Sequence, residues 1–186
     1  MTAMRVTRSR KLRHAVVAAL MLIGGPIMMA SPAAAAPPAN LVYLINGLSG
    51  KCLGINSGSH AIGALAMQWQ CANQPFSDQG WWLFQIGSVP NAYEIHNQNS
   101  FLCLGIDRAS VANGALAIQA ACSGQTYNNQ TWLEEPLGGG RVQFRNYNSG
   151  RCLGISAGSN ANGALAMQWD CANRAYSDQA WIYDPV

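Results

Sequence analysis

Apolar residues along most of the chain fall in short runs that are separated by turn-forming residues. Residues 41–45, 81–86 and 142–145 are such runs, and dipeptides such as Asn46-Gly47 and Ser57-Gly58 stand between them. Runs of this length with turn residues at close intervals are typical of β-strands. Beyond the N-terminal segment, no amphipathic stretch reaches the ten or more residues that a helix requires. The pattern therefore predicts an all-β chain with several short strands.

The N-terminal segment has a different pattern. The first 14 residues are basic, residues 15–29 are almost wholly apolar, and residues 30–36 are mostly alanine. This three-part order is typical of a secretory signal peptide with cleavage near Ala35 or Ala36. A membrane anchor is the alternative, but about 15 apolar residues are too few to span a bilayer. We expect residues 1–36 to be a signal peptide and the protein to be secreted into the extracellular space.

From about residue 41 onward the chain repeats one unit three times, at roughly 41–90, 91–139 and 140–186. Each copy contains Cys-Leu-Gly-Ile, then Gly-Ala-Leu-Ala, then a second cysteine and a Gln-x-Trp triplet. A repeat of this length indicates a modular architecture. Three units are too few for a propeller, and a solenoid would leave both ends uncapped. Closure around a pseudo-threefold axis buries all three apolar faces, so we predict a single β-trefoil domain over residues 37–186.

The six cysteines occur as two per copy, with the same spacing each time. In a threefold scaffold this spacing favours one disulfide in each repeat, Cys52–Cys71, Cys103–Cys122 and Cys152–Cys171, and export makes oxidation the expected state. A metal site is the weaker alternative because there is no C-x-x-C motif and only His60 and His96 follow the signal segment. We expect neither a metal nor another cofactor.

Comparison of the three copies separates scaffold positions from candidate site positions. The tryptophan of the Gln-x-Trp triplet occurs in every copy, as Trp81, Trp132 and Trp181, and is interpreted as a core residue. Trp69 and Trp169 differ, because their counterpart in the second copy is Ala120. A core role is the alternative, since these residues are in phase with apolar strand positions. Because a buried Trp rarely tolerates truncation to Ala, a surface site is favoured.

These features resemble the ricin B-type lectin family: three Gln-x-Trp triplets, a cysteine pair per copy, and a Trp two residues before the second cysteine. The resemblance covers the chain from about Leu41 to its end. It implies a carbohydrate-binding β-trefoil with up to one shallow site per repeat. In such a site an Asp follows the first cysteine by two residues, an aromatic ring precedes the second cysteine by two, and an Asn-Gln pair opens the triplet.

The chain departs from that pattern at the acidic position, which is Gly54, Gly105 and Gly154 in the three copies. The residue before the triplet is Asn only in the second copy and Asp in the other two. A rebuilt site is expected to use residues two positions beyond the lost Asp, because such residues share a face of a strand. The resulting carbohydrate-binding candidates, with repeats 1 and 3 as the working sites, are Asn56, Trp69, Asp78, Gln79, Asp107, Asn129, Gln130, Ser156, Trp169, Asp178 and Gln179.

Charge and motifs argue against other functions. After residue 36 the chain has six basic and eight acidic residues, which does not fit a nucleic-acid-binding protein. Residues 154–158 match G-x-S-x-G, but the equivalents of Ser156 are Asn56 and Asp107, and the third copy has no histidine. Glu134-Glu135 and the Glu94/His96 pair have no partner at a catalytic spacing, and we expect them to be solvated surface. The chain is not expected to be an enzyme.

The sequence therefore predicts a secreted, non-catalytic, monomeric protein without a membrane span, whose partner is a polysaccharide or glycan. A secreted protein-binding trefoil that has lost sugar binding, for example an inhibitor, is the alternative. Its contacts would come from the loops at residues 73–77 and 124–128, which contain Phe, Tyr and Asn. Trefoils host both roles, so the fold does not choose between them.

Overall fold

The computed structural model describes residues 41–186, and the predicted signal peptide lies outside these residues. Each repeat contributes four strands. The strands are β1 (Leu41–Asn46), β2 (Cys52–Ile55), β3 (Ala66–Trp69), β4 (Gly80–Gln85), β5 (Ala92–Asn97), β6 (Cys103–Ile106), β7 (Ala117–Ala120), β8 (Thr131–Gly138), β9 (Arg141–Asn146), β10 (Cys152–Ile155), β11 (Ala166–Trp169) and β12 (Trp181–Pro185). A 3-10 turn follows the second strand of each repeat: η1 (Asn56–Gly58), η2 (Asp107–Ala109) and η3 (Ser156–Gly158).

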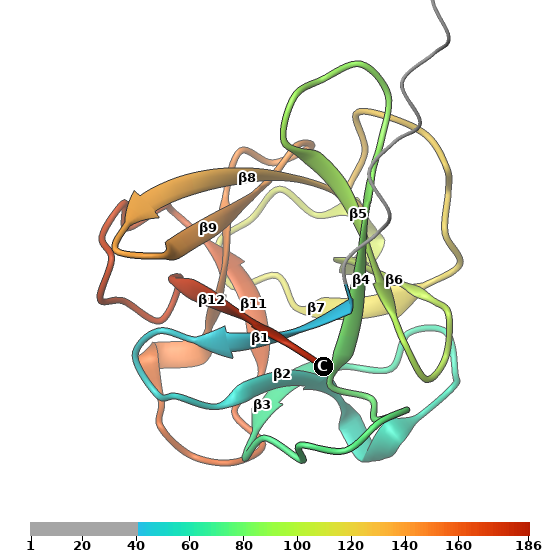
Figure 1. Ribbon diagram of the computed structural model, residues 1–186. Coiled ribbons are helices and arrows are strands. Elements are labelled where there is room, and N and C mark those ends of the chain that lie inside the picture. Colours follow the sequence, from blue (N-terminus) through green and yellow to red (C-terminus); the bar gives the residue numbers. More distant parts are fainter. Residues whose placement is uncertain (1–40) are drawn as a thin grey trace, which may run out of the picture. The chain divides into compact units, whose positions relative to one another are not determined.

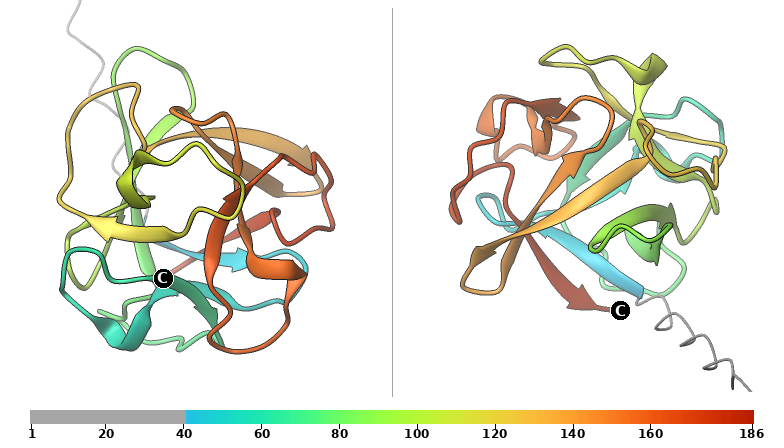
Figure 2. Two further views of the ribbon diagram at one scale, coloured as in Figure 1. Left: turned by 180° about the vertical axis from the view of Figure 1, so that it is seen from behind. Right: turned by 90° about the horizontal axis from the view of Figure 1, so that it is seen from above.

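Six of the strands close into an antiparallel barrel (Figure 1). The order is β1, β4, β5, β8, β9 and β12, and β12 pairs with β1 to complete the ring. The hairpins β2–β3, β6–β7 and β10–β11 surround a common axis in the left view of Figure 2. Isolated bridges join the hairpins to one another: Leu65 pairs with Ile118, Met67 with Leu165, and Leu116 with Met167. The predicted all-β class and β-trefoil fold are confirmed.

The core is built from equivalent side chains of the three repeats. Trp81, Trp132 and Trp181 are fully buried, as their threefold recurrence predicts. Each indole N–H donates a hydrogen bond to the carbonyl of the leucine that follows the first cysteine of its repeat, at 2.8, 2.9 and 3.1 Å. Because a buried indole needs an acceptor for its N–H, this contact satisfies the polar atom and fixes the ring.

The three disulfides pair as predicted, one in each repeat: Cys52–Cys71, Cys103–Cys122 and Cys152–Cys171. Each connects the start of the second strand to the segment that follows the third strand. Residues 41–186 contain no free cysteine. In this part of the chain, helices of the length and apolar character needed to cross a membrane are absent.

The prediction that the Glu94/His96 pair and Glu134-Glu135 are solvated surface is wrong for Glu94, while His96, Glu134 and Glu135 are partly exposed. Glu94 is buried and accepts hydrogen bonds from the backbone N–H of Gly124 at 2.9 Å and from the Ser123 hydroxyl at 3.2 Å. His96 Nε2 lies 3.2 Å from the same carboxylate. Glu94 thus supports the loop after the second cysteine, a role that the spacing of single residues in the sequence does not reveal.

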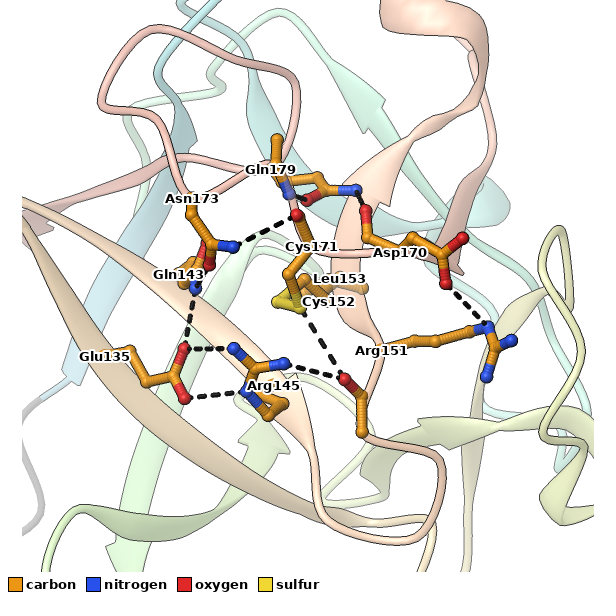
Figure 3. Close-up of a disulfide and its surroundings, with 12 residues drawn as sticks. Glu135, Gln143, Arg145, Arg151, Cys152, Leu153, Asp170, Cys171, Asn173 and Gln179 are labelled. Atoms are coloured by element: carbon orange, nitrogen blue, oxygen red, sulfur yellow. Dashed lines mark hydrogen bonds and ion pairs between the residues drawn. A yellow bond between two sulfur atoms is a disulfide. The ribbon is translucent and has the colours of Figure 1, made fainter.

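Glu135 is also partnered. Its carboxylate forms a bidentate ion pair with the Arg145 guanidinium, with nitrogen–oxygen distances of 2.7 and 3.0 Å (Figure 3). This hydrogen bonding to Arg145 lowers the pKa of Glu135. Glu134 accepts a hydrogen bond from the Tyr183 hydroxyl, and burial next to this carboxylate raises the pKa of Tyr183 well above its ordinary range. These acidic residues therefore stabilise the barrel strands β8, β9 and β12.

Candidate functional site

Two surface depressions lie in repeats 1 and 3, and they contain most of the predicted site residues. The depression of repeat 1 has a volume of about 520 Å³ and that of repeat 3 about 490 Å³. The first brings together Asn56, Trp69, Asp78 and Gln79. The second brings together the equivalent residues Ser156, Trp169, Asp178 and Gln179. The threefold relation of the repeats thus produces two closely similar concave surfaces.

The aromatic wall of each depression is a partly exposed tryptophan. Trp69 and Trp169 are each 50% exposed, so the alternative of a core position does not hold. Each ring lies against a glycine of a neighbouring repeat: a methyl group added at Gly163 or Gly114 would be 3.3 Å from Cζ3 of Trp69 or Trp169. The ring edge is held by this contact while about half of the side chain stays open to solvent. Such a ring can stack on an apolar surface such as the C–H face of a sugar.

The floor of each depression contains a carboxylate close to the glycine that replaces the family's Asp. In repeat 1, a Cβ atom added at Gly54 would lie 2.6 Å from Oδ2 of Asp78, and the corresponding distance from Gly154 to Asp178 is 3.0 Å. The same Oδ2 of Asp78 accepts a hydrogen bond from the backbone N–H of Ile55 at 2.8 Å. The carboxylate from the Gln-x-Trp loop therefore occupies the space that a side chain at position 54 or 154 would need.

These two carboxylates are partly withdrawn from water. Burial raises the pKa of Asp78 and of Asp178, and hydrogen bonds from backbone N–H groups offset part of this effect. An ionised carboxylate has about four acceptor positions, so the hydrogen bond from Ile55 leaves Asp78 able to accept others. The pair of a ring and a carboxylate in one depression can bind a ligand that has both an apolar face and hydroxyl donors.

The glutamines of the triplets are largely occupied by hydrogen bonds to the backbone, although Gln79 and Gln179 line the two depressions. Gln79, Gln130 and Gln179 are buried, at 3–6% exposure. In each, Oε1 accepts a backbone N–H at 2.6–2.8 Å and Nε2 donates to a backbone carbonyl at 2.8–3.1 Å. The amide therefore ties the triplet to the segment around the second cysteine. These hydrogen bonds hold the preceding Asp or Asn in place, and direct ligand binding by the three glutamines stays a prediction.

The argument that Asn56 and its equivalents share a strand face with the lost Asp is wrong. Strand β2 ends at Ile55, and Asn56 begins the turn η1. Asn56 and Ser156 still line their depressions, because the turn folds over the end of the strand. In repeat 2, Asp107 begins η2, and its carboxylate lies 3.9 Å from the exposed Arg108.

Repeat 2 keeps Asn129 in a different arrangement. Its Nδ2 donates to the carbonyl of Ile106 at 2.7 Å, whereas Asp78 accepts from the N–H of the equivalent Ile55. The amide thus satisfies a backbone acceptor where the carboxylate satisfies a backbone donor. Ala120 provides no ring, so the predicted difference between repeat 2 and the other two is present in the geometry.

Sequence reasoning missed a polar rim beside Trp169. Arg151 Nε lies 3.6 Å from the Asp170 carboxylate, and Asn113 Nδ2 donates to the same carboxylate at 2.8 Å. Figure 3 shows Arg151 and Asp170 pointing toward each other. In repeat 1 the rim is smaller, and the backbone N–H of Gln70 donates to Asn162 Oδ1 at 3.0 Å. A sequence signal for this rim was present: Asn113 and Asn162 contact the two repeats that have a surface tryptophan, whereas the equivalent residue that faces repeat 2 is Ile62.

The described residues do not offer a metal site at their closest cluster of metal-type ligands. His96, Cys103 and Cys122 have ligand atoms within 4.8 Å of one another. Both cysteines belong to one disulfide, so neither provides the thiolate that binds metals. This cluster does not fit a metal ion.

Solved structures with a similar fold include single domains and parts of larger proteins. The designed threefold-symmetric protein ThreeFoil has a TM-score of 0.70 and 26% identity over 78% of this chain and 99% of that one. An exo-β-1,3-galactanase from Clostridium thermocellum has a TM-score of 0.71 and 27% identity over 81% of this chain, but this covers only 31% of the galactanase. The C-terminal half of the earthworm R-type lectin, solved in complex with GalNAc, has a TM-score of 0.59 and 15% identity over 79% of this chain and 99% of that one.

A search of curated proteins found no significant match to this sequence. The family model described as "Ricin-type beta-trefoil lectin domain-like" matches residues 35–119 and 77–169. These overlapping matches include all of the first two repeats and most of the third. The chain belongs to the ricin-type β-trefoil lectin domain-like family.

Proposed function

We propose that the protein is a secreted, non-catalytic carbohydrate-binding protein, a monomer in dilute solution, with two sites in each chain, one in repeat 1 and one in repeat 3. The observation that carries this proposal is the pairing of a half-exposed tryptophan with a partly buried carboxylate, found twice in equivalent depressions. Lectins of the same fold, such as the earthworm R-type lectin half in complex with GalNAc, support the ligand class. The domain begins at about residue 37, after removal of the signal peptide.

In each proposed site the indole stacks on one face of a pyranose ring. Asp78 or Asp178 then accepts hydrogen bonds from sugar hydroxyls, and Asn56 or Ser156 contributes from the rim. The carboxylate thus performs from the Gln-x-Trp loop the task that the family's Asp performs from the second strand. Repeat 2 has Ala120 in place of the ring and Asn129 in place of the carboxylate before the triplet. Its Asp107 and Asn129 are therefore expected to bind sugar weakly or not at all.

A single site of this kind is expected to be weak. One ring and a few hydrogen bonds in a shallow depression correspond to a Kd near 1 mM, or about −4 kcal/mol. Two sites on one rigid domain gain affinity for a polysaccharide because the second contact becomes intramolecular. The protein should therefore bind a polymer or a dense glycan surface much more tightly than a free monosaccharide.

The direct test is a glycan array followed by titration of the best ligand with the double variant Trp69→Ala/Trp169→Ala. We expect the variant to lose most of the polysaccharide affinity while its melting temperature stays near that of the wild type. A matched control is Phe76→Ala, which removes an aromatic ring that is 78% exposed but lies outside both depressions. Unchanged glycan binding by the double variant, or equal losses in the control, would contradict the proposal.

Export and oxidation are tested separately on secreted protein. Intact mass should show the loss of about 35 residues and the mass of three closed disulfides, with no reaction toward thiol reagents. Native protein of full length, or native protein with reactive thiols, would contradict this part of the proposal.

A protein-binding trefoil is the second candidate, and exposed rings at the loop tips favour it. Phe76, Tyr127 and Tyr176 occupy the same position of the three repeats and are 78%, 54% and 73% exposed. Aromatic residues of this kind are frequent at protein interfaces. A pull-down from protein extract, repeated after glycosidase treatment of the captured partner, separates the two candidates. Binding that survives the treatment favours the protein-binding function.

A further inference from the structure

The surface of repeat 2 that corresponds to the tryptophan sites is more apolar than its equivalents: Ile62, Leu102 and Ala121 stand where the other repeats have polar residues, and Phe101 stands where they have glycine. We call this surface the repeat-2 face and define it by Ile62, Phe101, Leu102, Ala120 and Ala121. At the site of Trp69 the equivalent residues are Asn162, Gly50, Lys51, Trp69 and Gln70. At the site of Trp169 they are Asn113, Gly150, Arg151, Trp169 and Asp170. Loss of sugar binding alone would not require these polar residues to become apolar.

These five residues lie together around the end of β7. The backbone N–H of Gly63, next to Ile62, donates to the carbonyl of Gln119 at 2.8 Å. Cys103 pairs with Ala120 across the hairpin, which places Leu102 opposite Ala121. The carbonyl of Phe101 lies 3.6 Å from Sγ of Cys122. The face therefore combines residues from the loop of repeat 1 with residues from both strands of the repeat-2 hairpin.

The repeat-2 face has an open space where the other repeats have an indole ring. A methyl group added at Gly163 or Gly114 would touch Trp69 or Trp169 at 3.3 Å, whereas one added at Gly63 would meet nothing within 4 Å among the described residues, its two chain neighbours apart. Because the backbone around the three glycines is equivalent, this space has room for the edge of an aromatic ring.

The same face also presents an exposed aromatic ring. Phe101 is 73% exposed and has a φ of 58°. The equivalent residues Gly50 and Gly150 have similar positive φ values. The left-handed conformation is unfavourable for a bulky side chain, and glycine is the residue that adopts it freely. Phe101 therefore holds most of its ring in solvent at a backbone conformation that the glycines of the other repeats adopt more easily. Ile62, at 68% exposure, lies on the same face.

We propose that the repeat-2 face binds the same face of a second copy of this chain around a twofold axis, with Phe101 of each copy entering the space above Gly63 of the other. An exposed ring and a space for a ring on one surface are the features that a self-complementary twofold interface needs. The five residues carry no charge, so no like charges meet across the axis. The proposal does not depend on sugar binding.

The interface is small, because each copy contributes one aromatic ring and a few aliphatic groups. Specific interfaces of this size are at the weak end of the range, and we expect a Kd of roughly 10–100 µM. Dilute protein is then monomeric, as expected from the sequence. At the high local concentration reached on a polysaccharide surface, the dimer joins four tryptophan sites in one particle.

Sedimentation velocity over a range of concentrations, from well below to well above the expected Kd, tests the proposal on the mature, disulfide-bonded protein. The wild type should shift from monomer to dimer. The variant Ile62→Asn/Phe101→Gly/Leu102→Lys/Ala121→Gln should stay monomeric at every concentration. Each introduced residue already occurs at the equivalent position of another repeat, and Phe101→Gly removes backbone strain, so the variant should fold with an unchanged or higher melting temperature.

A second variant tests the space above Gly63 by itself. Ala120→Trp should fill the space from within the same chain, as Trp69 and Trp169 fill theirs, and should weaken dimerisation at least tenfold. Trp69→Ala is the control, because it changes the equivalent position of repeat 1 and should leave dimerisation unchanged. A wild type that remains monomeric at the highest concentration overturns the proposal. A dimer that is unaffected by both repeat-2 variants also overturns it, since the interface would then lie elsewhere.

Discussion

Repeats 1 and 3 differ from repeat 2 in a consistent way, although all three share one scaffold. The buried Gln-x-Trp tryptophans, the disulfides and the glutamine hydrogen bonds are the same in every repeat. The surface tryptophan, the carboxylate beside it and the polar rim occur in repeats 1 and 3 but not in repeat 2. Because the scaffold residues do not depend on the surface residues, one repeat can lose its site without loss of the fold.

The largest effect should come from the contrast between the two classes of tryptophan. Trp132→Ala removes a fully buried ring and leaves the carbonyl of Leu104 without its indole donor, which should lower the free energy of unfolding by about 3–5 kcal/mol. Trp69→Ala removes a ring that is half exposed, at a position where repeat 2 has Ala, and should cost about 1 kcal/mol or less. Chemical denaturation under oxidising conditions measures both values. Similar losses from the two variants would mean that Trp69 is part of the core.

The second prediction concerns the carboxylates that distinguish repeats 1 and 3 from repeat 2. The variant Asp78→Asn/Asp178→Asn gives both sites the amide of Asn129 while leaving the rings in place. Hydrogen bonds to a charged acceptor contribute about 1.5–3 kcal/mol, so each site should lose about tenfold or more in affinity. Calorimetric titration with the best ligand measures this loss. The control is Asn129→Ala, which should leave the affinity unchanged; an equal loss in that variant would place the binding in repeat 2.

The raised pKa values of these carboxylates give an effect of pH on both binding and stability. Because burial raises the pKa of Asp78 and Asp178 above the ordinary value of 3.8, the sites should lose their anionic acceptors while the pH is still above that value. Sugar binding should therefore weaken on mild acidification, and the Asp78→Asn/Asp178→Asn variant should lack this dependence.

The contribution of the same groups to folding has the opposite sign. A carboxyl group whose pKa is higher in the folded than in the unfolded state stabilises the fold at low pH, and this contribution is lost as the pH rises through the folded-state pKa. Replacement by Asn should thus raise the melting temperature slightly at neutral pH while it weakens binding. A fall in the melting temperature at neutral pH would show that the hydrogen bond to Ile55 outweighs the cost of burying the charge.

The fold was predictable from the sequence because the repeat supplies three copies of each structural requirement. A residue that occurs at all three equivalent positions, such as the triplet tryptophan, reports the scaffold directly. The same comparison located Trp69 and Trp169 at the surface, since Ala120 occupies the third position.

The finer geometry of the site was not predictable in the same way. The position of Asp78 beside Gly54 follows from the approach of the Gln-x-Trp loop to strand β2, about 23 residues earlier in the chain, and no spacing rule gives that distance. The backbone hydrogen bonds of the three glutamines were not predictable either, because a glutamine that binds the backbone and one that binds a ligand look the same in a sequence. Glu94 was misassigned because its partners, Ser123 and Gly124, are about 30 residues away.

The smallest expected effect is a gain of function that converts repeat 2 into a third site. Ala120→Trp/Asn129→Asp restores the ring and the carboxylate on the scaffold of repeat 2. The space above Gly63 can hold the indole edge, and Gly105 leaves room for a carboxylate at position 129, because its missing Cβ would lie 3.4 Å from Nδ2 of Asn129. The affinity for a monosaccharide should stay the same for each site, while the stoichiometry rises from two to three and the affinity for a polysaccharide increases. Calorimetry measures the first two quantities and polysaccharide pull-down the third, with Ala120→Trp alone as the control. If the double variant folds normally but still binds only two sugars, the rim residues beside Trp69 and Trp169 are required in addition to the ring and the carboxylate.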